Sequence, residues 1–76
     1  MKTVEAAVIG VGWVGGTRAE TLSRTALVDK LHLCDIRADR LAEMKALCKP
    51  ATATLDYQDI VNNSNISVVY ISTTPE

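Results

Sequence analysis

The chain has 76 residues and 8.2 kDa, with 47% hydrophobic and 22% charged residues, which predicts a small folded domain, or part of a larger one, rather than a disordered chain. Its net charge of −1 and pI of about 5.7 give no electrostatic basis for nucleic-acid binding. No apolar run approaches the roughly 20 residues that cross a bilayer, so no membrane partner is expected. With neither a secretory signal nor a disulfide framework apparent, the cytoplasm is the expected location.

The first half of the chain predicts a strand, a helix and a second strand. Val4–Ile9 is a mostly apolar run that stops at Gly10, and a second apolar run, Leu31–Cys34, stops at Asp35. Short runs of this kind are typical of strands that are buried on both faces of a parallel sheet. Between the two runs, small and apolar residues recur at helical spacing up to Arg24, which predicts a helix directly after a glycine-rich loop.

A second helix is expected to begin near Asp39 and to end before Pro50, which cannot continue it. Its apolar residues recur at steps of three and four: Leu41, Met44, Leu47 and Cys48. The residues Ala51–Thr54 that follow are short and β-branched at alternate positions, and they predict a weak third strand.

A short helix over Tyr57–Asn62, with Asp56 as its N-cap, and a last strand over Ile66–Ser72 complete the expected elements. Strands that alternate with helices indicate a parallel sheet with right-handed crossover helices. We therefore predict an α/β fold: a parallel sheet of about four strands in the spatial order 3-2-1-4, which is the first half of a Rossmann dinucleotide-binding fold.

The spacing Gly10-x-Gly12-x-x-Gly15 is the strongest functional signal, because it lies directly between the first strand and the first helix. Gly10 lets the chain turn out of the strand, Gly12 lets a pyrophosphate lie against the backbone, and Gly15 lets the helix pack closely on the sheet. The N–H groups around Gly12, Trp13 and Val14 are expected at the helix N-terminus, where the dipole favours an anion. The alternative is a tight turn that binds nothing.

Asp35 ends the second strand, 20 residues after Gly15, where an acid can accept hydrogen bonds from both hydroxyls of an adenosine ribose. Its charge would repel a 2′-phosphate, which favours NAD as the cofactor. Arg37 or Arg40 could instead contact a 2′-phosphate or stack on the adenine, so NADP stays possible. The competing interpretations are a carboxylate that caps a loop and two solvated arginines.

Five further residues are candidates for a functional role. Thr73 and Thr74 end the last strand, where their hydroxyls are predicted either to contact the cofactor or to bond to the local backbone. His32 lies within a strand and is predicted to be packed rather than catalytic. Cys34 and Cys48 lack the spacing of a metal site and are predicted to be small buried hydrophobes. No catalytic residue and no metal ligand is predicted.

Four segments resemble, in the same order, the amino-terminal half-domain of the Gfo/Idh/MocA oxidoreductases: residues 8–16, 33–36, 56–61 and 69–74. The last segment departs from the family pattern, because Thr74 stands where members often have a proline. The resemblance implies cofactor contacts from eight positions: Gly10, Gly12, Trp13, Val14, Gly15, Asp35, Thr73 and Thr74. Arg37 is a further candidate for cofactor binding, on its charge alone.

The resemblance implies the NAD(P)-binding portion of an oxidoreductase that transfers hydride between a nicotinamide cofactor and a sugar or polyol. Family members continue into a Glu-Lys-Pro segment and a second domain that forms the substrate pocket. Residues 1–76 are therefore expected to be a partial dinucleotide-binding domain without the substrate domain and without activity of their own. A non-enzymatic nucleotide-binding or sensing module is the second hypothesis, and a Rossmann-like methyltransferase the third. A bare face on the last strand also predicts self-association.

Overall fold

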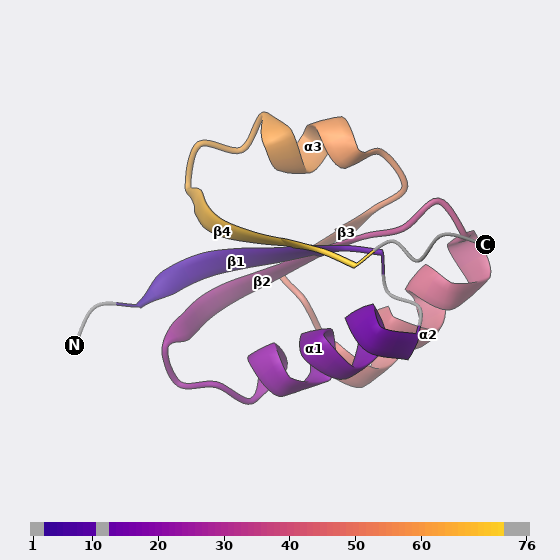
Figure 1. Cartoon of the computed structure of the whole chain (residues 1–76), viewed down its shortest axis with the longest axis horizontal. Coiled ribbons are helices and arrows are strands. Elements are labelled where there is room, and N and C mark those ends of the chain that lie inside the picture. Colours follow the sequence, from indigo (N-terminus) through magenta and orange to yellow (C-terminus); the bar gives the residue numbers. More distant parts are fainter. Residues whose placement is uncertain (1–2, 11–12, 73–76) are drawn as a thin grey trace.

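The computed structural model describes residues 3–10 and 13–72, and the side chains of residues 13–15 lie outside this description. In chain order the elements are β1 (Val4–Ile9), α1 (Trp13–Ser23), β2 (Val28–Cys34), α2 (Ala38–Cys48), β3 (Thr52–Thr54), α3 (Tyr57–Val61) and β4 (Ile66–Ile71) (Figure 1). The predicted alternation of strands and helices is confirmed.

The four strands form one parallel sheet in the order β3-β2-β1-β4, which confirms the predicted fold class and strand order. β1 lies in the middle, and its Val8 pairs with Leu33 of β2 on one side and with Tyr70 of β4 on the other. Because every pair is parallel, the carboxyl ends of the strands meet at one edge of the sheet.

β2 begins at Val28, three residues before the start predicted from the apolar run Leu31–Cys34. Asp29 and Lys30 are exposed, whereas every residue of the apolar run is buried. Val28 and Lys30 continue the pairing with β1, opposite Val4 and Glu5, and the register shifts between these two pairs, at Asp29. The apolar pattern therefore marks the buried part of the strand and not its whole length.

Two separate cores lie on the two faces of the sheet. Figure 1 shows α1 and α2 on one face and α3 on the other. The larger core, under α1 and α2, is formed by Val8, Ala19, Leu31, Leu33, Leu41, Met44 and Cys48. The smaller core, under α3, is formed by Ala7, Cys34 and Ile60. The long helices therefore contribute most of the buried apolar surface, and α3 covers only part of its face.

The helix ends follow the expected capping chemistry in part. The Asp56 carboxylate accepts a hydrogen bond from the Gln58 N–H at 2.9 Å, which confirms Asp56 as the N-cap of α3. α3 ends at Val61, one residue before the predicted end, and Asn62 is its C-cap. Lys49 adopts a left-handed conformation (φ 50°) after α2 and terminates it before Pro50.

A row of polar side chains crosses three strands on the face of the sheet that carries α3. The ring of His32 on β2 is hydrogen-bonded through Nδ1 to Thr52 Oγ1 of β3 at 2.7 Å and through Nε2 to Glu5 Oε1 of β1 at 2.9 Å. His32 is only 3% exposed, so these two bonds satisfy polar atoms that water cannot reach. The prediction of a packed histidine is confirmed.

Candidate functional site

The carboxyl ends of the strands bring the predicted site residues to one edge of the sheet. The N–H of Gly10, which follows β1, donates to the Cys34 carbonyl at 2.8 Å. The N–H of Ser72, which follows β4, donates to the Ile9 carbonyl at 2.8 Å. Asp35 follows Cys34 directly, so the exits of β1, β2 and β4 are tied together by backbone hydrogen bonds. Thr73 and Thr74, like Gly12, lie outside the described residues.

Gly10 adopts a φ of 89°, a conformation that glycine tolerates and that costs other residues about 1–2 kcal/mol. The chain turns out of β1 at this point and enters α1 at Trp13. This confirms the turning role predicted for Gly10. Close packing of α1 on the sheet is visible at Gly16, which is buried, and at Ala19, which is fully buried.

The N-terminus of α1 lies where the predicted anion would bind. Its first turn, which includes Trp13, Val14 and Gly15, carries no acidic residue. The other two helices carry an acid there, Asp39 in α2 and Asp59 in α3. An acid in the first turn offsets the positive end of the helix dipole, so α1 keeps a more electropositive N-terminus than α2 or α3.

Asp35 is held in a fixed turn directly after β2. Its Oδ1 accepts a hydrogen bond from the Arg37 N–H at 2.8 Å, and its own N–H donates to the Thr54 carbonyl at 3.2 Å. The carboxylate therefore does cap its loop, as the competing interpretation held. A carboxylate offers about four acceptor positions, so this turn is compatible with further hydrogen bonds to a ribose.

The two candidate arginines lie beside carboxylates of α2. Arg37 Nη2 is 3.8 Å from Asp39 Oδ2, with both side chains more than 70% exposed, and such a pair contributes little stability. Arg40 Nη1 is 3.1 Å from Glu43 Oε2. Arg37 thus lies close to Asp35 in the chain, with its guanidinium at the solvent-exposed surface.

The charges of three carboxylates act on Cys34, the last residue of β2. Burial raises the pKa of the Cys34 thiol, and the charges of Asp35, Asp56 and Asp59 raise it further. Sequence patterns drew attention to Asp35 alone, but Asp56 and Asp59 follow β3 and so reach the same sheet edge by topology. Three negative charges therefore lie near the carboxyl end of β2.

The cysteines do not form a metal centre in the part of the chain that the structure describes. Cys34 and Cys48 are buried free thiols, as predicted. No group of three or more His, Cys, Asp or Glu side chains that could hold a metal ion occurs within residues 3–10 and 13–72. Across the same residues, no helix is long and apolar enough to cross a membrane.

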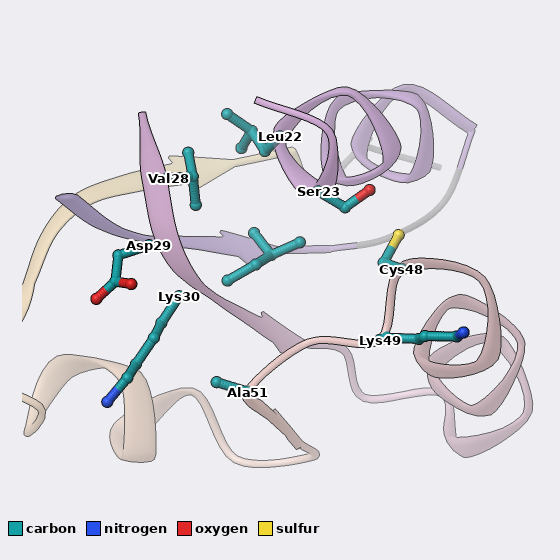
Figure 2. A pocket seen from close by; sticks show the side chains of 9 residues that line it. Leu22, Ser23, Val28, Asp29, Lys30, Cys48, Lys49 and Ala51 are labelled. Carbon is teal, nitrogen blue, oxygen red and sulfur yellow. The ribbon is translucent and has the colours of Figure 1, made fainter. Parts of the chain in front are cut away.

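A pocket of about 250 Å³ lies away from the candidate site, between the end of α1, the start of β2 and the end of α2 (Figure 2). Its lining includes Ser23, Lys30, Cys48 and Lys49, and no predicted site residue. Burial raises the pKa of the Cys48 thiol, and a hydrogen bond with the Ser23 side chain partly opposes that rise. The pocket is therefore separate from the glycine turn.

Comparison with curated proteins identifies relatives among the inositol dehydrogenases. Inositol 2-dehydrogenase/D-chiro-inositol 3-dehydrogenase of Lactiplantibacillus plantarum is 35% identical over 66 residues, which cover 82% of this chain and 18% of that protein. Inositol 2-dehydrogenase of Salmonella typhimurium is 30% identical over 76 residues, with 97% and 23% covered. The chain spans about a fifth of the length of these curated relatives. No family model matches it.

Solved structures give the same result for the fold. Myo-inositol 2-dehydrogenase from Lactobacillus plantarum superposes with a TM-score of 0.83 at 26% identity, covering 96% of this chain and 22% of that chain. A probable dehydrogenase from Thermotoga maritima has a TM-score of 0.84 at 28% identity, with 93% and 21% covered. Scyllo-inositol dehydrogenase from Lactobacillus casei, solved with bound NAD(H) and scyllo-inositol, has a TM-score of 0.83 at 19% identity, covering 96% and 22%.

Proposed function

We propose that this chain, which belongs to the Gfo/Idh/MocA family and corresponds to the amino-terminal portion of its members, binds a nicotinamide dinucleotide. The observation that carries the proposal is the turn at Gly10, with φ 89°, which leads from the central strand β1 to the N-terminus of α1. A turn of this kind leaves room for a pyrophosphate against backbone N–H groups.

The chain's own residues fit the cofactor in three places. The pyrophosphate would lie at the glycine loop and the first turn of α1, against Gly10, Gly12, Trp13, Val14 and Gly15. The Asp35 carboxylate would accept hydrogen bonds from the hydroxyls of the adenosine ribose. The nicotinamide half of the cofactor would extend toward Thr73 and Thr74. When bound, the nicotinamide would accept hydride in one direction of the reaction and donate it in the other, and the residues of this chain would bind and orient the cofactor.

NAD is the proposed form of the cofactor. The turn formed with the Arg37 N–H fixes the Asp35 carboxylate at the sheet edge, and the charges of Asp56 and Asp59 act on the same Cys34 thiol as that of Asp35. A 2′-phosphate placed there would face three negative charges. Arg37, which could offset them, lies at the surface near Asp39 at 3.8 Å.

The wider reaction is proposed from the relatives, which are named for inositol. We infer a parent activity that transfers hydride between the cofactor and a polyol or sugar. Residues 1–76 would supply the cofactor-binding part, and the substrate pocket and proton-transfer groups would lie in other parts of the protein. The chain by itself is then expected to bind NADH without oxidising a polyol. Its cytoplasmic location stays a prediction.

Isothermal titration of the 76-residue chain tests the proposal. NADH and ADP-ribose should both bind saturably, because both carry the pyrophosphate and the adenosine ribose, whereas nicotinamide mononucleotide should bind more weakly. Gly12→Val should weaken NADH binding by at least about tenfold, because a side chain would fill the place of the phosphates. Ala46→Val, which adds the same side chain on the exposed face of α2, is the control. No saturable NADH binding, or equal binding by Gly12→Val and the wild type, would contradict the proposal.

A further inference from the structure

The end of β3 is joined to Asp35 by a backbone hydrogen bond. The Asp35 N–H donates to the Thr54 carbonyl at 3.2 Å, directly after the pair of Cys34 and Thr54 that ends the parallel ladder between β2 and β3. The Asp35 carboxylate also accepts the Arg37 N–H at 2.8 Å. The direction of this carboxylate therefore depends on its own loop and on Thr54 of the neighbouring strand.

The Thr54 side chain ties the end of β3 to the start of α3. Its hydroxyl donates to the Asp59 carboxylate and accepts a hydrogen bond from the Asp56 N–H at 3.1 Å. A hydroxyl has one proton and two lone pairs, so both hydrogen bonds can form together. Asp56 in turn accepts the Gln58 N–H at 2.9 Å as the N-cap of α3. The loop between β3 and α3 therefore closes on the Thr54 hydroxyl.

β3 is too short to be fixed by its ladder in the way that β1 and β2 are. It spans three residues, Thr52–Thr54, whereas β2 spans seven. Hydroxyl groups hold both of its ends, since Thr52 Oγ1 is 2.7 Å from His32 Nδ1 and Thr54 Oγ1 contacts the loop before α3. Thr54 is only partly buried, so apolar packing holds it less than it holds a core residue. The hydroxyl of Thr54 is thus a main restraint at the end of β3 that faces Asp35.

We propose that Thr54 is a positioning residue for the adenosine ribose and acts through Asp35. This inference rests on the proposed function, because it takes the Asp35 carboxylate as the acceptor of the ribose hydroxyls. The Thr54 hydroxyl holds the end of β3 against α3, and the Thr54 carbonyl then holds the Asp35 N–H. The carboxylate keeps one direction before the ligand arrives, so binding does not have to order it.

Titrations with ADP and 2′,3′-dideoxy-ADP test this role, because the two ligands differ only in the ribose hydroxyls. The wild-type 76-residue chain should bind ADP at least about fivefold more tightly. Thr54→Val keeps the shape of the side chain and removes its hydroxyl. It should bring the ratio of the two dissociation constants closer to one, by weakening ADP and leaving 2′,3′-dideoxy-ADP unchanged. The loss cannot exceed the wild-type ratio, because Thr54 acts only through the hydroxyls of the ribose.

Three further variants separate this role from a general loss of stability. Thr54→Ser retains the hydroxyl and should restore the wild-type ratio. Thr25→Val removes a hydroxyl that donates to the Thr21 carbonyl at 2.9 Å, after the end of α1, and should also keep the wild-type ratio. Asp59→Ala, at an exposed position, removes the acceptor of the Thr54 hydroxyl and should lower the ratio as Thr54→Val does. Circular dichroism checks that each variant is folded.

A purely structural role for Thr54 would lower the free energy of unfolding without moving the ratio. A wild-type ratio in folded Thr54→Val, or in Asp59→Ala should Thr54→Val not fold, would therefore overturn the proposal. An equal loss of affinity for both ligands would overturn it too, because the effect would not pass through the ribose hydroxyls. A wild-type chain that binds neither ligand would contradict the proposed function itself, and this inference with it.

Discussion

Asp35→Asn separates the charge of the residue at the end of β2 from its role in the local turn. The Asp35 Oδ1 accepts the Arg37 N–H at 2.8 Å, and an asparagine Oδ1 can accept the same hydrogen bond. The turn should therefore persist, and the change in free energy should come from the lost negative charge. Asp29→Asn, an exposed carboxylate at the opposite end of β2, is the matched control.

The expected magnitude follows from the surroundings of Asp35. Hydrogen bonds from ribose hydroxyls to a neutral acceptor are weaker than those to a carboxylate by about 1 kcal/mol, so NADH should bind about fivefold less tightly. Because Asp35 is partly exposed, water screens its repulsion of a 2′-phosphate, and removing it should favour NADPH by about 1–2 kcal/mol. The preference for NADH over NADPH should then fall by about 2–3 kcal/mol, or about 30–150-fold.

Fluorescence titrations with NADH and NADPH on both variants and on the wild type measure this ratio. The ratio of the two dissociation constants should change for Asp35→Asn and stay at the wild-type value for Asp29→Asn. An unchanged ratio in Asp35→Asn would refute the assignment of Asp35 to the ribose. A wild-type chain that binds NADPH more tightly than NADH would refute the proposed preference itself.

Three further substitutions or conditions address the fold, each measured by urea denaturation. Leu33→Ala should lower the free energy of unfolding by about 2–5 kcal/mol because Leu33 is fully buried, whereas Leu47→Ala, at a position 55% exposed, should change it by less than about 1 kcal/mol; similar losses would show that the core is misassigned. His32→Leu should cost about 2 kcal/mol, because it removes two hydrogen bonds of about 1 kcal/mol each, and a neutral effect would mean that these hydrogen bonds contribute nothing. Burial raises the pKa of the Cys34 thiol above 9.0, so the stability that its neutral form supplies should be complete below pH 9 and should decline as the pH rises beyond it; Cys34→Ala should reduce that decline, and an identical pH profile would contradict the assignment.

The order of helices and strands was predictable from the sequence because the hydrophobic periodicity agrees with the positions of the glycine and proline residues that end the elements. Val4–Ile9 is apolar and stops at a glycine, and the α2 residues Leu41 and Met44 recur at helical spacing. The start of β2 was not predictable, because Val28 and Lys30 pair with β1 through their backbone while the Asp29 and Lys30 side chains stay in water. A hydrophobic pattern reports burial, and backbone pairing extends beyond it.

The candidate site was predictable in outline for a similar reason. Gly10 was predicted from its spacing, and its φ of 89° confirms the turn. The hydrogen bond from the Asp35 N–H to the Thr54 carbonyl, and the nearness of Asp56 and Asp59 to Cys34, depend on contacts across β2 and β3. Sequence periodicity carries no information on such contacts until the strand order is known.

The proposal holds that the turn after β1 and the N-terminus of α1 bind the dinucleotide. An amide chemical-shift titration of the ¹⁵N-labelled chain with NADH is its most direct test. We expect saturable shifts that are largest at the backbone amides from Gly10 to Gly15, with a second group at Asp35. The amides around the pocket at Cys48 and Lys49 should not shift. Saturable shifts confined to that pocket, or no saturable shifts at the turn, would contradict it.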